Sequence, residues 1–188
     1  MGIVTKAATG NSPFIVGVSG HRDLHPANLA RLRDAGGCFV QEIRQHLPDT
    51  ELRGMVGMAE GADLLVAQTA LDLGVNVEAV LPMPLEEYAA DFDANTLPLL
   101  RSLLARTEVR CTELSPPRHV DTLADEGARR DALYTNLTET LIRRSSLLLA
   151  LWDGSPAPLP GGTADTVLQY LGVRSDLNQL TDNIRLVD

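Results

Sequence analysis

Short apolar runs that alternate with longer helical patterns constrain the fold of this chain more than any other feature. Five such runs are typical of strands: 14–19, 52–57, 75–81, 109–112 and 147–152. Strands that alternate with helices predict a parallel sheet with helices on both faces. Continuous apolar runs also fit strands that are covered on both sides. We therefore expect an α/β fold with a mostly parallel central sheet of about five strands.

The segments between these runs have apolar residues at helical spacing. They predict helices over 26–47, 61–73, 85–106 (one or two helices, broken near 95–98), 125–144 and 163–171. Gly36 and Gly37 inside the first helix each cost about 1 kcal/mol relative to alanine, so we expect close packing there. The predicted organisation is a flexible tail over 1–12, one domain over 13–173 and an extension over 174–188, which either packs as a small helix or leads into a further domain.

Charge and composition exclude several classes of function. The 188 residues include 25 acidic and 16 basic ones, for a net charge of −9, and Lys6 is the only lysine. This balance argues against binding of bulk nucleic acid, which needs a basic surface. No apolar run reaches the roughly 18–20 residues of a membrane span. Cys38 and Cys111 lack a CxxC spacing, so we expect reduced thiols in the core of a cytoplasmic protein.

Polar residues and glycines gather after the predicted strands, where ligands bind in open parallel sheets. The candidate ligand-binding residues are Gly20, His21 and Arg22, then Gly57, Ala59, Glu60, Gly61 and Asp63, then Asp153, Gly161, Gly162, Thr163 and Asp165. Arg22 is a permanent cation whose planar fork suits phosphate or carboxylate. Alternatively, Arg22 has only a structural role and forms an ion pair with Asp23 or Asp63.

The Gly161-Gly162-Thr163 turn opens a predicted helix. Glycines there let backbone N–H groups approach an anion, and a helix N-terminus favours negative charge. Thr163 can cap the helix or bond a phosphate oxygen, and the alternative is an ordinary glycine-rich turn with a threonine cap. Asp165 would repel a phosphate directly above it, so we expect it to bind ribose hydroxyls instead.

Other chemistries find less support in the sequence. His21 and His25 do not supply the three or four converging ligands that a metal site needs, so we predict no metal. The Walker, dinucleotide-binding and G-x-S-x-G motifs are absent from the sequence. Glu60 and Asp165 are candidates for general acid and base, and the sequence does not fix their roles. Arg130, Tyr134 and Asn136 would reach a nucleotide if the long helix over 125–144 flanks the site.

Taken together, these motifs resemble the SLOG superfamily of Rossmann-like, three-layer domains, which are related to DNA-processing protein A (Smf) and to the LONELY GUY phosphoribohydrolases. The resemblance covers residues 14–171, and the segments that support it are 20–22, 57–63, and 149–154 leading to 161–163. The Gly-x-Ala-x-Gly-Ala-Asp loop is similar to the DNA-processing branch, and the Pro-Gly-Gly-Thr loop to the LONELY GUY branch. LONELY GUY enzymes have Pro-Gly-Gly-x-Gly-Thr-x-x-Glu, whereas here Thr163 follows the glycine pair directly and Leu168 or Gln169 stands near the glutamate position.

The resemblance implies a domain that binds or senses a nucleotide or an ADP-ribose-like ligand, without a certain cofactor. In this reading Gly161, Gly162 and Thr163 cradle phosphate, Arg22 neutralises it, and Glu60, Asp63 and Asp165 face the ribose or the base. One alternative is a LONELY GUY-like N-glycosidic hydrolase of nucleoside 5′-monophosphates. A second alternative is a protein-interaction module without a ligand. The resemblance further implies a homodimer or a fused effector domain.

Overall fold

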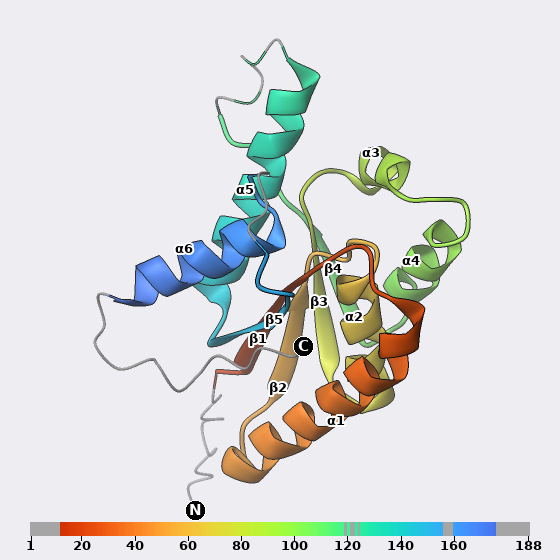
Figure 1. Ribbon diagram of the computed structural model, residues 1–188, viewed down its shortest axis with the longest axis vertical. Helices are drawn as coiled ribbons and strands as arrows, with labels where there is room; N and C mark the ends of the chain where they lie inside the picture. The colour runs from red at the N-terminus through yellow and green to blue at the C-terminus, as the bar shows by residue number, and fades with distance from the viewer. Residues whose placement is uncertain (1–11, 119, 121–122, 124, 156–159, 176–188) are drawn as a thin grey trace, which may run out of the picture.

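The computed structural model describes residues 12–118, 120, 123, 125–155 and 160–175. Its centre is a single five-stranded sheet in the order β4-β3-β2-β1-β5, and every pairing is parallel (Figure 1). The strands are β1 (Phe14–Gly20), β2 (Leu52–Val56), β3 (Asn76–Leu81), β4 (Val109–Glu113) and β5 (Leu147–Leu151). The predicted α/β fold with a parallel, five-stranded sheet is thus confirmed.

Helices cover both faces of this sheet, which gives three layers (Figure 1). They are α1 (Leu29–His46), α2 (Ala62–Asp72), α3 (Leu85–Tyr88), α4 (Leu97–Leu104), α5 (Glu126–Arg144) and α6 (Thr163–Ser175), with 3₁₀ turns at Pro26–Asn28 and Ala89–Asp91. Helices α1, α2 and α4 lie on one face, and α5 and α6 lie on the other. Helix α6 runs to Ser175, beyond its predicted end at Leu171 and beyond the predicted domain boundary at 173.

The apolar core has one part on each side of the sheet. On the α2 side, buried side chains of β1 and β5 meet those of α2, as in the cluster Val16, Ala62, Leu65, Leu149 and Leu151. On the α5 side, the buried side chains are Met55, Val80, Leu137 and Leu141. Helix α6 covers the outer strand β5 by packing Val167 and Tyr170 on Leu148 and Ala150. Side chains of the central strands are therefore buried on both faces, as continuous apolar runs predict.

Two contacts fix the position of α5 on the sheet. A Cβ on Gly17 of β1 would lie 2.1 Å from the Ser145 Oγ, so the end of α5 fits only against a strand without a side chain there. Glu78 of β3 is 5% exposed and pairs with Arg144, whose Nη2 lies 2.8 Å from Oε1 and 3.0 Å from Oε2. These contacts bring the N-terminal half of α5 to the carboxyl edge of the sheet, where the candidate site lies.

Two predictions about packing were wrong. Cys38 and Cys111 are exposed rather than in the core, because α1 turns Cys38 outward and Cys111 lies on the outer strand β4. Gly36 and Gly37 do not bring α1 into close contact with a neighbouring element. A Cβ on Gly37 would meet nothing within 4 Å, and one on Gly36 would make an ordinary contact of 3.5 Å with Thr69.

Among the described residues, no helix has the length and apolar character that crossing a bilayer requires.

Candidate functional site

The strand order reverses at β1, since the chain proceeds from β1 through β2 and β3 to β4 on one side and returns to β5 on the other. Crevices at such reversals bind ligands in open α/β sheets. Hydrogen bonds tie the loops together at this point: the His21 amide donates to the Leu151 carbonyl (3.1 Å) and the Ala62 amide to the His21 carbonyl (3.0 Å). The His21 Nε2 also lies 3.0 Å from Asp153 Oδ1, so this side-chain pair connects the ends of β1 and β5.

A pocket of about 400 Å³ opens beside this reversal, between the carboxyl edge of the sheet and the helices α5 and α6. Its volume lies within the roughly 300–1,000 Å³ of small-molecule sites. The end of β1, the β2–α2 loop, α5 and the turn before α6 all contribute to its lining, which includes Ser19, Arg22, Ala59, Asp63, Arg130, Asp131, Tyr134, Thr138, Gly161, Gly162 and Thr166. Five predicted ligand-binding residues are thereby brought together: Arg22, Ala59, Asp63, Gly161 and Gly162.

A cluster of charged and aromatic groups holds Arg22 at the mouth of this pocket. The Arg22 Nη2 donates to the Tyr134 hydroxyl (2.9 Å) and its Nη1 to the Asp91 carbonyl (3.4 Å). The guanidinium carbon also lies 5.8 Å from the centre of the Tyr134 ring, a cation–π distance. Tyr134 in turn donates its hydroxyl proton to Asp91 Oδ2 (2.5 Å). Arg22 is thus oriented by Tyr134 and Asp91, not by Asp23 or Asp63.

Asp91 contacts both arginines: Arg130 pairs with its Oδ1, and Arg22 donates to its backbone carbonyl. Burial alone would raise the pKa of Asp91, but the hydrogen bonds from Arg130 and Tyr134 outweigh burial and place this pKa below its usual range. Burial and the bond to Asp91 raise the pKa of Tyr134 to about 12, so the phenol stays neutral and keeps donating. Arg130 pairs with the Asp91 carboxylate directly, whereas Arg22 is linked to it only through the Tyr134 hydroxyl. The two guanidinium groups and the one carboxylate of this cluster together carry a positive charge.

Asp63 lies in the floor of the pocket and is 6% exposed. Its Oδ2 accepts a hydrogen bond from the Ala59 amide (3.2 Å). Burial raises its pKa to about 7, against the opposing effects of this hydrogen bond and of the Arg22 charge. A carboxyl group that titrates near neutral pH in a pocket is typical of functional sites.

Glycines allow the loops of the site to lie against one another. Gly61 has φ +77°, and a Cβ there would lie 2.0 Å from the Arg22 carbonyl oxygen. Gly161 has φ +73°, and a Cβ there would lie 2.7 Å from the Cβ of Tyr134. Side chains are therefore excluded at both positions by conformation and by space. The Gly161 amide donates to Asp165 Oδ2 (2.8 Å), so a carboxylate of the chain itself already occupies one donor of this turn.

Eight of the thirteen predicted site residues do not line the pocket: Gly20, His21, Gly57, Glu60, Gly61, Asp153, Thr163 and Asp165. The Glu60 Oε1 accepts hydrogen bonds from the Asp93 amide (2.8 Å) and from Thr96 Oγ1, which stabilises the turn before α4. Asp165 bonds the Gly161 amide and Gln169 Nε2 (2.9 Å). Thr163 is 8% exposed at the start of α6. Both candidate catalytic acids, Glu60 and Asp165, are thus occupied in turns of the chain.

Gly20 and Gly57 shape the edge of the site without lining it. A Cβ on Gly20 would lie 2.3 Å from that of Ala62, and one on Gly57 would lie 3.1 Å from Asp63 Oδ2. Residues that the sequence analysis missed include Asp91, Asp131, Thr138 and Thr166. The pattern around Asp91 indicates only the end of a helical turn, so no sequence signal points to its contacts with α5.

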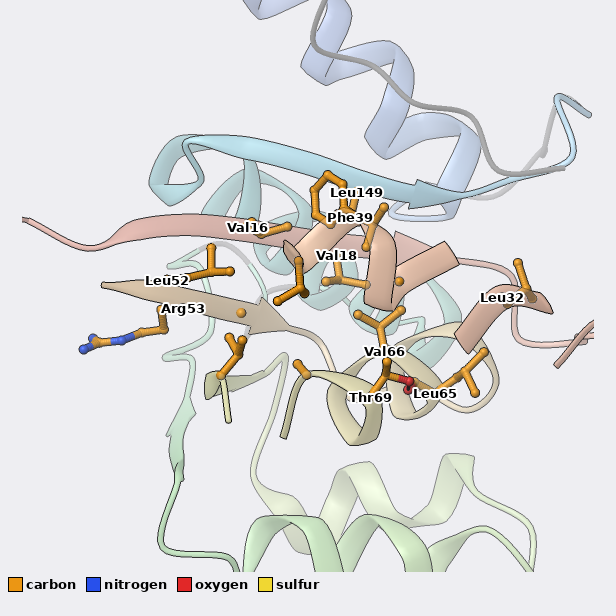
Figure 2. Close-up of a pocket in the computed structure, with 15 residues that line it drawn as sticks. Val16, Val18, Leu32, Phe39, Leu52, Arg53, Leu65, Val66, Thr69 and Leu149 are labelled. Carbon is orange, nitrogen blue, oxygen red and sulfur yellow. Dashed lines mark hydrogen bonds between the residues drawn. The ribbon is translucent and has the colours of Figure 1, made fainter. Parts of the chain in front are cut away.

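A metal centre finds no support in the described part of the chain, where no group of three or more His, Cys, Asp and Glu side chains could hold an ion. A second hollow, of about 40 Å³, lies between α1, α2 and the middle of the sheet (Figure 2). Aliphatic side chains such as Val16, Leu65 and Leu149 line it, with Thr69 and Arg53 among the few polar residues. It lies away from the carboxyl edge of the sheet, so the first pocket is the candidate site.

Comparisons with known proteins give matches of structure. No protein-family model matches the chain, and no curated protein matches it. The chain is similar to the X-ray structure of the structural-genomics target TM1055, with 16% identity, a TM-score of 0.44 and coverage of 85% of this chain and 69% of that one. It is also similar to DNA processing protein A (DprA) from Streptococcus pneumoniae, with 16% identity and a TM-score of 0.40.

The match to DNA processing protein A covers 86% of this chain, which spans only 56% of that longer protein.

Proposed function

We propose that this protein binds a nucleotide or an ADP-ribose-like ligand in the pocket at the carboxyl edge of its sheet, as a ligand-sensing domain. The supporting observation is the meeting of Arg22, Asp63 and the start of α6 in one pocket of about 400 Å³ beside the strand-order reversal. A cation, a carboxyl group and a helix N-terminus together offer partners for phosphate and for sugar hydroxyls.

Arg22 and the start of α6 are the proposed phosphate partners. Tyr134 and the Asp91 carbonyl take two of the five N–H donors of the guanidinium, so the Arg22 side chain is already oriented and has donors left for an anion. The first N–H groups of a helix have no partner within the helix. Because Asp165 binds the Gly161 amide, we assign the phosphate to Arg22 and to the amides from Gly162 onward.

An N-glycosidic hydrolase is the second candidate, and one observation favours it. Asp63 is a buried carboxyl group in the pocket with a pKa of about 7, as a general acid or base requires near neutral pH. Asp63 is therefore the candidate general acid or base in place of Glu60 and Asp165, whose carboxylates accept hydrogen bonds from backbone amides of nearby turns. This reading predicts release of free base from a nucleoside monophosphate.

The test is binding by the wild type and by two arginine variants. AMP, ADP, ADP-ribose, cyclic ADP-ribose and NAD are each added in a thermal-shift assay, and hits are titrated by calorimetry. A ligand at about 100 times its Kd stabilises the native state by about 2.7 kcal/mol, which raises the Tm of a chain of this size by about 5–10 °C. Chromatography of the same samples detects free base and separates a sensor from a hydrolase.

Arg22→Ala should weaken the binding of any hit at least tenfold, because it removes a charged donor to phosphate. Arg143→Ala is the matched control. This control also removes one positive charge, but Arg143 lies on α5, its side chain is 65% exposed, and it pairs with Glu139 outside the pocket. A panel without any shift, or equal binding by the two variants, would contradict the proposed function.

A further inference from the structure

The carboxyl group of Asp63 has two unlike oxygens. Oδ2 accepts the hydrogen bond from the Ala59 amide, whereas among the described residues no hydrogen bond to Oδ1 is found. Asp63 is 6% exposed and lines the pocket. Oδ1 is not among the fully buried atoms of the described residues, so it reaches the pocket and is available to accept a donor from a bound ligand.

Several elements place charged or titratable groups around this carboxyl. Arg22, from the loop after β1, attracts the ionised form. Tyr88, from α3, donates its hydroxyl proton to the Gly57 carbonyl (3.0 Å), and its own pKa is raised well above its usual value by burial and then by neighbours that include Asp63. From α5, Arg130, Asp131 and Tyr134 line the same pocket. Tyr88 is thus neutral and committed to a carbonyl, so it does not compensate an ionised Asp63.

We propose that Asp63 determines the sugar specificity of this pocket: its Oδ1 accepts a hydrogen bond from a ribose hydroxyl of the ligand, and binding is therefore accompanied by release of a proton from Asp63. This inference rests on the proposed function and names the group that recognises the sugar. The proton passes from the carboxyl group to solvent, and no covalent bond of the ligand changes.

The chemistry of the two protonation states supports this coupling. Burial raises the pKa of Asp63 to about 7, so the carboxyl group is largely protonated below neutral pH. An ionised carboxylate only accepts hydrogen bonds, and its bonds from hydroxyl donors are stronger than those to a neutral acid. A ribose hydroxyl therefore binds the ionised form better, and the apparent Kd rises as the ionised fraction falls.

The test uses ADP-ribose as the probe, since its pyrophosphate has no secondary ionisation near neutral pH. Its Kd is measured by calorimetry from pH 5.5 to 8.5, in two buffers of different ionisation enthalpy. For the wild type the Kd should rise by about tenfold per pH unit below pH 7 and stay level above pH 8. Close to one proton should be released per ADP-ribose at pH 6, and few at pH 8.5.

Two variants separate Asp63 from the rest of the pocket. Asp63→Asn keeps an acceptor for the Ala59 amide, so its Kd should be independent of pH, at least tenfold weaker than the wild type at pH 8 and close to it at pH 5.5. Asp131→Asn, which changes the other carboxylate of the lining, should retain the pH dependence.

Binding of ADP-ribose with equal Kd at pH 6 and pH 8 and without proton release would overturn the inference and leave the proposed function standing. Loss of the pH dependence in Asp131→Asn rather than in Asp63→Asn would also overturn it. Absence of ADP-ribose binding by the wild type at every pH would overturn this inference, and a blank thermal-shift panel would overturn the proposed function as well. If a variant fails to fold, a wild-type Kd that does not change with pH, without proton release, still overturns the inference.

Discussion

The buried carboxyl group of Asp63 should make this protein less stable as the pH rises, and Asp63→Asn should abolish that effect. Burial raises the pKa of Asp63 from 3.8 to about 7. Between these two values the native state binds more protons than the unfolded state. The contribution of Asp63 to the free energy of unfolding therefore falls with increasing pH in this range, from its full value below 3.8 to a constant lower value above 7.

The size of this effect follows from the two pKa values. At about 1.4 kcal/mol per pKa unit, the difference between 3.8 and about 7 amounts to about 4 kcal/mol over the whole range. Between pH 5 and pH 8 the same relation gives a loss of about 2–3 kcal/mol. Asparagine has the same shape, accepts the bond from the Ala59 amide and carries no titrating charge, so the variant should not show this loss.

Urea unfolding of both proteins at pH 5, 6, 7 and 8, followed by circular dichroism, measures the effect. Other titrating groups contribute equally to the two proteins, so the difference between their free energies of unfolding isolates Asp63. The variant should gain about 2–3 kcal/mol on the wild type from pH 5 to pH 8. A difference that stays constant within about 0.5 kcal/mol over this range would refute the claim that the folded chain buries a carboxyl group of raised pKa.

Three further predictions test the packing and the exposure of other residues. Gly161→Ala should lower the free energy of unfolding in urea by about 2 kcal/mol or more, because Gly161 has a positive φ and a Cβ there would lie against Tyr134. Gly37→Ala should instead stabilise α1 by up to about 1 kcal/mol, since a Cβ there meets nothing within 4 Å. Equal effects of the two substitutions would contradict the described packing. Tyr134→Phe removes the hydroxyl that links Arg22 to the Asp91 carboxylate and should lower the free energy of unfolding by about 1 kcal/mol. An unchanged urea midpoint would argue against these two hydrogen bonds. Cys38 and Cys111 should both react with a thiol reagent in the native protein. Cys111 should react more slowly, because partial burial of its thiol and the charge of Glu113 raise its pKa, and protection of either cysteine until unfolding would contradict its exposure.

The fold could be predicted from sequence because its main signal is local. Parallel strands that are covered on both faces appear as continuous apolar runs, and all five predicted strands match observed ones within two residues at either end. The wrong prediction that Cys111 lies in the core also comes from this local signal. A short apolar run indicates a strand but not its place in the sheet, and β4 is an outer strand whose side chains are largely exposed.

The site could be predicted only in part, because its cluster depends on contacts between distant segments. Arg22 was a candidate from its place after β1, whereas Asp91, which binds Arg130 and Tyr134, lies about 40 residues before them in a turn without a motif. The sequence predicts Gly61 and Gly161 only as ligand-binding residues. Gly61 and Gly161 also meet a demand for positive φ and close packing, and a sequence pattern does not separate the two roles.

The cytoplasmic location, the homodimer and the fused effector domain stay predictions, and each follows from the sequence or the resemblance rather than from a contact in the described residues.

The most direct test of the central claim is a nuclear magnetic resonance titration of the ¹⁵N-labelled protein with ADP-ribose. The pocket and the aliphatic hollow beneath α1 both contain glycines, whose amide signals occupy a separate region of the spectrum. We predict that the signals of Gly161 and Gly162, together with that of Ala59, shift in a saturable manner, while those of Gly36 and Gly54 stay in place. Shifts confined to Gly36 and Gly54, or a spectrum unchanged by ADP-ribose, would contradict the assignment of the ligand to the carboxyl edge of the sheet.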